Sequence, residues 1–235
     1  MTPAFEEIPD KMPSLPGHSG EGRAAPRCAE LRDGFTWRQL TLAGLAVLAE
    51  KVVGGRDLQL GEALALSRVR LPFVAAMVKL RSGERHTPTP EPLPISRVAL
   101  RPKSLRHIGQ PLADWESFCT TLIAIRNEAS TGGGAIAWYP ILDQPLDGDH
   151  GCNGDFTGVE VLRAISLARL LLPAEVEVQA PLAMLGPKLA QVALDFGASH
   201  LGYVAVDGDT CDDPLVANSS LFNELLESVS TTEMQ

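Results

Sequence analysis

The chain has 235 residues, of which 45% are hydrophobic and 21% are charged, a composition typical of a globular protein with a substantial core. Its net charge of −9 argues against a nucleic-acid partner, which would need a basic surface. No window reaches the roughly 18 apolar residues of a membrane span, and the acidic N-terminus lacks a signal-peptide pattern. Four scattered cysteines do not form a disulfide framework. We therefore expect a cytoplasmic protein with reduced thiols.

The first 104 residues predict a leader, a helical segment and a linker. Residues 1–34 are rich in proline, glycine and charge, which is typical of a disordered leader. Apolar residues at helical spacing within the segment 35–86 predict helices at 42–52, ended by Gly54-Gly55, and at 59–67 and 72–81. Residues 87–104 are proline-rich and predict a linker or an extended edge segment. The basic residues between 97 and 106 favour a solvated loop, with a phosphate or partner site as the alternative.

Residues 105–235 predict strands that alternate with helices. A short apolar run indicates a strand at 135–142, alternating polar and apolar residues indicate one at 175–180, and a further strand is expected at 200–206. Helices are expected across 115–125, from a capping box of Thr157 and Glu160 to residue 172, at 186–196 before a terminal glycine cap at Gly197, and at 221–229. This alternation is typical of parallel βα units. About three units fit, whereas a full barrel takes ~250 residues. The expected fold is α/β, a partial TIM-type (βα) barrel with an N-terminal helical segment.

Several segments carry a family resemblance. The most specific reads Met184-Leu-Gly-Pro-Lys-Leu-Ala-Gln-Val-Ala-Leu-Asp-Phe-Gly-Ala198, and it is supported by Glu160-Val-Leu-Arg-Ala-Ile-Ser-Leu-Ala-Arg-Leu-Leu-Leu-Pro173 and the Thr131-Gly-Gly turn. They resemble the radical S-adenosylmethionine (SAM) enzymes of menaquinone biosynthesis by the futalosine route, aminofutalosine synthase and dehypoxanthine futalosine cyclase. The resemblance covers residues 40–86 and 105–227, and it implies that about four barrel units are absent between them.

The sequence departs from this family at the reactive centre. The family holds a [4Fe–4S] cluster on a tight cysteine triplet, whereas the cysteines here are more than thirty residues apart, at Cys28, Cys119, Cys152 and Cys211. A cluster needs thiolates that converge on one small volume. After Ile108-Gly109 the family shows a histidine and then a glutamate, where this chain has Gln110 and Leu112. We therefore expect that the protein binds neither cofactor of the intact family, the cluster or SAM. We also expect that it is not an enzyme of that type.

Three residues are candidates for a residual substrate pocket. In the intact family the end of the barrel that they occupy faces substrate, which implies a binding role for Gln179, Gly186 and Lys188. A surface lysine is the simpler interpretation of Lys188.

Other polar clusters have a plain interpretation beside a functional one. Asp147, Asp149, His150 and Cys152, imagined together with His107 and Cys119, offer ligands for a weak divalent metal site, but a flexible polar loop is the simpler interpretation. A pair of short acidic motifs after the last strand favours a solvated loop over a polar ligand site; its residues are Asp207, Asp209, Asp212 and Asp213. Cys119 is expected to be a buried structural thiol, and no metal site is expected.

Two functions remain open. An incomplete barrel has open sheet edges that need a cover, which favours a non-catalytic partner of a radical SAM enzyme or of a second copy of the chain. The alternative is a protein that binds a small molecule, nucleoside-like or SAM, or a non-radical enzyme that uses the late-barrel pocket. A chain with no remaining activity is a third reading.

Overall fold

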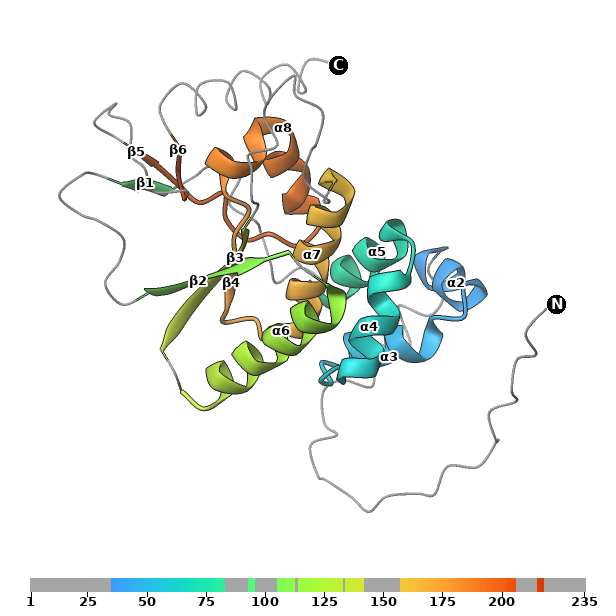
Figure 1. Cartoon of the computed structure of the whole chain (residues 1–235). Helices are drawn as coiled ribbons and strands as arrows, with labels where there is room; N and C mark the ends of the chain where they lie inside the picture. Colours follow the sequence, from blue (N-terminus) through green and yellow to red (C-terminus); the bar gives the residue numbers. More distant parts are fainter. Residues whose placement is uncertain are drawn as a thin grey trace.

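The computed structural model describes residues 35–82, 93–95, 105–112, 114–132, 134–141, 157–205 and 215–217. The leader at 1–34 and the helix at 221–229 that the sequence predicts lie outside these ranges, as does the polar loop that holds Asp147, Asp149, His150 and Cys152. The described helices are α2 (Phe35–Leu42), α3 (Ala46–Val53), α4 (Leu60–Arg68), α5 (Leu71–Ser82), α6 (Trp115–Ser130), α7 (Gly158–Leu171) and α8 (Leu182–Asp195). The strands are β1 (Leu93–Ile95), β2 (Leu105–Pro111), β3 (Ala135–Ile141), β4 (Glu177–Val178), β5 (Tyr203–Ala205) and β6 (Val216–Ala217), so the chain is an α/β protein (Figure 1).

The strand pairings in the described residues are all parallel. β3 lies between β2 and β4 in one sheet, and β5 lies between β1 and β6 in another. A parallel bridge between Gln179 and His200 joins the end of β4 to the segment before β5. Since α6, α7 and α8 connect β2, β3, β4 and β5 in turn, these elements are successive parallel strand–helix units, as the sequence predicts.

One face of the sheet β2-β3-β4 is apolar and covered by helices. Ile108, Trp138 and Val178 form one row across the three strands, and Trp138 and Val178 are fully buried. The ring of Phe118 in α6 meets the ring of Trp138 edge to face, with centroids 6.0 Å apart. Figure 1 shows the N-terminal helices lying beyond α6 and α7, and one hydrophobic core runs continuously through both parts.

Arg81 in α5 ties the N-terminal helices to the end of α7. Its guanidinium Nη1 donates to the backbone carbonyls of Arg169 (2.9 Å) and Leu170, and its Nη2 donates to the carbonyl of Leu172 (3.1 Å). Carbonyls in the last turn of a helix have no donor within the helix and carry the negative end of its dipole. Arg81 therefore caps α7 from a different part of the chain.

Two further arginines make the same kind of contact across this boundary. Arg163 in α7 donates to the carbonyls of Ser67 and Val69 at the end of α4. Arg126 in α6 donates to the carbonyl of Leu58, at 2.8 Å. The helical segment and the βα units are therefore joined by hydrogen bonds as well as by the apolar core.

Two helix boundaries lie where the sequence predicts them. At the start of α7, the Thr157 N–H donates to the Glu160 carboxylate at 2.7 Å, which completes the predicted capping box. After α8, Gly197 has φ of 105°, a left-handed conformation that favours glycine at the end of a helix.

Other boundaries differ from the expectation. The segment expected as one helix at 42–52 is divided by Gly44 (φ 73°), so Leu42 ends α2 and a separate helix, α3, follows. Glycine adopts this conformation without the steric cost that other residues meet. The described strand β4 is shorter than the predicted 175–180, and β5 begins later than residue 200.

The proline-rich segment, expected as a linker or an extended edge segment, contains a strand. β1 pairs with β5, with Leu93 beside Tyr203. In the described residues β1 lies at the edge of its sheet, which suits Pro94, because proline cannot donate a hydrogen bond to a second neighbour.

None of the described helices is long and apolar enough to cross a membrane.

Replacing Arg81 by alanine is expected to lower the free energy of unfolding by about 2–4 kcal/mol, since several charge-assisted hydrogen bonds are lost. Urea unfolding followed by circular dichroism measures this change. The control is Arg70→Ala, an exposed arginine just before α5, which should shift stability by less than about 0.5 kcal/mol. Equal midpoints for the two variants would contradict the capping role.

Candidate functional site

The face of the sheet away from α6 and α7 carries polar side chains. The register aligns His107 in β2 with Glu177 in β4. Alternation along a strand puts these residues on the face opposite Trp138. Gln179 continues the same side after β4 and pairs with His200. We call this set the polar face; its members are His107, Gly109, Tyr139, Glu177, Gln179, His200 and Tyr203.

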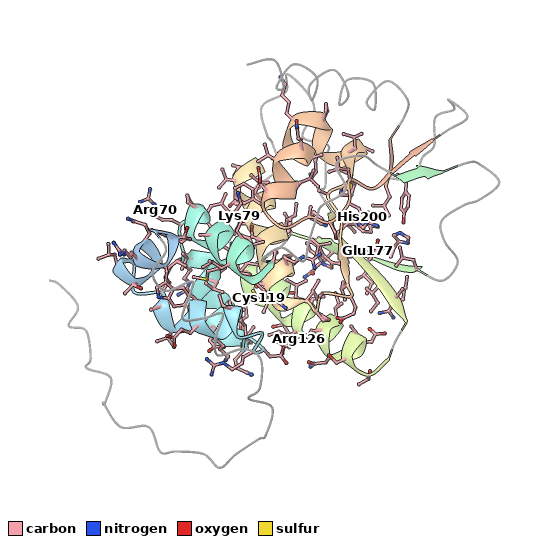
Figure 2. The ribbon with its side chains drawn as sticks, turned by 180° about the vertical axis from the view of Figure 1, so that it is seen from behind. Arg70, Lys79, Cys119, Arg126, Glu177 and His200 are labelled. Carbon is pink, nitrogen blue, oxygen red and sulfur yellow. The ribbon has the colours of Figure 1, made fainter. Side chains whose placement is uncertain are left out.

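The centre of the polar face is formed by Glu177, Gln179 and His200. The Gln179 Nε2 donates to the Glu177 carboxylate at 3.3 Å. The His200 Nδ1 lies 3.9 Å from the same carboxylate oxygen, which is too far for a hydrogen bond. Gln179 is completely buried, and both its Oε1 and the His200 Nδ1 are buried without a hydrogen-bond partner. Figure 2 labels Glu177 and His200 next to each other at the strands.

His107 and Tyr203 contact each other across the polar face. The His107 Nε2 lies 2.9 Å from the Tyr203 hydroxyl, and the two rings meet edge to face. In a flat sheet, β2 and β5 would lie about 14 Å apart with β3 and β4 between them. The direct contact therefore requires the strands to curl, with the polar face on the concave side.

Gly109 allows a close approach between neighbouring strands. A Cβ atom at this position would lie 2.7 Å from the Tyr139 Cζ and hydroxyl and 2.6 Å from the Ile141 Cδ1. The Tyr139 side chain therefore crosses directly over the backbone of β2. Gly109 lies inside β2, two residues before the strand ends at Pro111.

Gln110 and Leu112, which stand where the resembling family has a histidine and a glutamate, belong to the interior. Gln110 points to the helix-covered face, where its Nε2 donates to the Phe118 carbonyl (2.9 Å) and its Oε1 accepts from the Trp138 indole (2.8 Å). Leu112 is buried in the hydrophobic core. Both residues stabilise the packing of α6 on β3.

The structure describes all three predicted pocket residues, and their surroundings differ. Gln179 belongs to the polar face. Gly186 is buried and breaks α8 into two parts, with φ of 70° and ψ of 164° just before Pro187. Lys188 follows on the exposed side, and no hydrogen bond or ion pair joins it to Gln179 or Gly186.

The structure describes only two of the metal ligands that the sequence suggests, His107 and Cys119. Cys119 is fully buried in α6, as expected, and burial raises its pKa to about 11. His107 lies on the polar face, so the sheet separates it from Cys119. Among the described residues no three histidine, cysteine or acidic side chains gather around a possible metal position. The other metal candidates, Asp147, Asp149, His150 and Cys152, lie outside the described residues. So do the acidic motifs proposed for a polar ligand (Asp207, Asp209, Asp212 and Asp213) and two more cysteines, Cys28 and Cys211.

Glu177 and His200 are the site residues that sequence reasoning missed. The sequence did contain a signal for Glu177. Glu177-Val178-Gln179 alternates polar and apolar residues on a predicted strand, which directs both polar side chains to one face. His200 carried no local signal, because its neighbour Gln179 is 21 positions away and becomes adjacent only in the sheet.

Comparison with known proteins does not identify a relative. No protein-family model matches the chain, and no curated protein matches it.

Exchanging each of the two buried glutamines for methionine should change stability in opposite directions. Gln179→Met removes an unpaired buried oxygen, so the free energy of unfolding is expected to rise by about 1 kcal/mol. Gln110→Met leaves the buried Trp138 indole N–H without an acceptor, so a loss of about 2 kcal/mol is expected. Urea unfolding of both variants measures the difference. A loss of stability in Gln179→Met would mean that its oxygen is satisfied in solution.

Proposed function

We propose that the chain is a radical-SAM-like protein related to aminofutalosine synthase, without cluster chemistry, that acts as a non-catalytic partner. The parallel strand–helix units and the curl required by the His107–Tyr203 contact support a partial (βα) barrel. The relation to the futalosine route to menaquinone rests on the sequence resemblance, which carries the family's [4Fe–4S] cluster and SAM only as cofactors of the intact enzymes. A cytoplasmic location fits the scattered cysteines.

The observation that carries this proposal is the state of Cys119. Cys119 is fully buried within the hydrophobic core, and this burial raises the pKa of its thiol to about 11, whereas reactive or ligating cysteines lie in partly exposed sites that favour the thiolate. The other three cysteines are at positions 28, 152 and 211, far from one another in the sequence. A cysteine triplet of the family type therefore has no counterpart in this chain.

The sheet edge supports a partner role. Within the described residues β2 pairs with β3 on one side only. An edge strand of seven residues offers backbone donors and acceptors to another chain. We therefore propose that β2 is covered either by a radical SAM enzyme or by a second copy of this protein.

Anaerobic iron–sulfur reconstitution of the full chain tests the first part of the proposal. Iron and sulfide analysis should find no stoichiometric cluster, and the absorbance that clusters give at about 400 nm should be absent. Light scattering on the same sample should give a mass of at least two chains, or a larger complex once a radical SAM partner is added.

Either of two results would contradict the proposal. A stoichiometric cluster would mean that the scattered cysteines converge and that the enzyme interpretation returns. A monomer that no radical SAM enzyme binds would remove the partner role.

A second candidate function is favoured by the unpaired atoms of the polar face. Buried polar atoms are normally hydrogen-bonded, so an unpaired Gln179 Oε1 supports a small-molecule site, for a nucleoside-like ligand or SAM, or a non-radical enzyme that uses the same face. Calorimetric titration of the full chain with SAM and with futalosine-type nucleosides should then show saturable binding. If neither ligand binds, this candidate loses its support.

A further inference from the structure

We propose that the polar face holds a primary ammonium group of a small molecule, bound between Glu177, Gln179 and His200. This inference extends the second candidate function, because it uses the same face, and it specifies the chemical group that the site recognises.

The charge of the site favours a cation. Within the described residues Glu177 has no lysine or arginine partner; its carboxylate contacts only the Gln179 Nε2 and, at 3.9 Å, the His200 Nδ1. The Glu177 side chain keeps 32% of its accessible surface, so a ligand can reach the carboxylate. A carboxylate that lacks a counter-charge beside buried dipoles attracts a positive ligand.

The spacing of the acceptors fits a single nitrogen atom. A nitrogen within about 2.8 Å of both the Glu177 oxygen and the His200 Nδ1 would see these two atoms at an angle of about 90°, since hydrogen bonds have that length and the atoms are 3.9 Å apart. That angle suits two of the three tetrahedral N–H bonds of an ammonium group. This binding mode requires the His200 tautomer with its proton on Nε2, because Nδ1 is then an acceptor.

Gln179 supplies the third acceptor. Its Nε2 is held by Glu177, and its Oε1 lies on the same amide carbon, about 2.2 Å from Nε2. The Oε1 is buried without a donor, and leaving such an atom unpaired is costly. An ammonium group has a third N–H beside the two that Glu177 and His200 would accept, and we assign this third donor to the Gln179 Oε1.

A titration of the full ¹⁵N-labelled chain with n-butylammonium chloride tests the proposal. At constant ionic strength, backbone signals of residues 177–179 and 200 should shift saturably, with a dissociation constant on the order of 1 mM for so small a ligand. Tetramethylammonium chloride carries the same charge without N–H donors and should give no saturable shift. Glu177→Gln and Gln179→Met should each weaken binding at least about tenfold. Glu175→Gln, an exposed carboxylate two positions earlier, should leave it unchanged.

Three results would overturn the inference. Equal shifts with the two cations would indicate non-specific attraction by charge, and full binding by Glu177→Gln or Gln179→Met would place the site elsewhere. No saturable shift at all would mean that water alone occupies the acceptors. A parallel titration with SAM and futalosine-type nucleosides separates this failure from that of the second candidate function, because those ligands would still bind if only the ammonium site were wrong.

Discussion

The position of the polar face depends on the buried guanidinium of Arg169. Arg169 lies in α7 and donates to the Gly197 carbonyl (3.0 Å), the Val176 carbonyl (3.3 Å) and the Ser199 hydroxyl (3.1 Å). These contacts fix the chain immediately before β4 and immediately before His200. One side chain thus sets the separation of the two segments that carry Glu177 and His200.

Within the part of the chain that the structure describes, no carboxylate lies beside this buried cation. Burial, and secondarily the nearby Arg81, lower the pKa of Arg169 to about 10, so the group stays charged near neutral pH. Oxygen dipoles satisfy it in place of an anion, which avoids the cost of an unpaired buried charge. Gly197 fits the same constraint, because a Cβ there would lie 2.8 Å from the Arg169 Cβ.

Much of the fold could be predicted from the sequence, whereas the site could be predicted only in part. The boundaries at Thr157 and Gly197 follow from local chemistry, in one case a capping box and in the other a left-handed glycine, and both are confirmed. The division at Gly44 was not predicted, because a single glycine within an apolar pattern ends a helix only when its conformation is left-handed. Gln179 was selected from a resemblance, and its partner His200 is close only through the sheet. Contacts between segments distant in sequence are not encoded in any short window.

The pairing of β1 with β5 has a consequence for how the chain folds. Leu93 and Tyr203 are more than a hundred positions apart, and contacts of such high sequence separation form late because long loops must close first. During synthesis the proline-rich segment around β1 has no strand to pair with until the region of β5 has been made. The units from β2 to α7 have near neighbours in the sequence and can assemble earlier. We therefore expect the sheet β1-β5-β6 to form after the units from β2 to α7, so that the side of the polar face that Tyr203 contributes is completed only at that step.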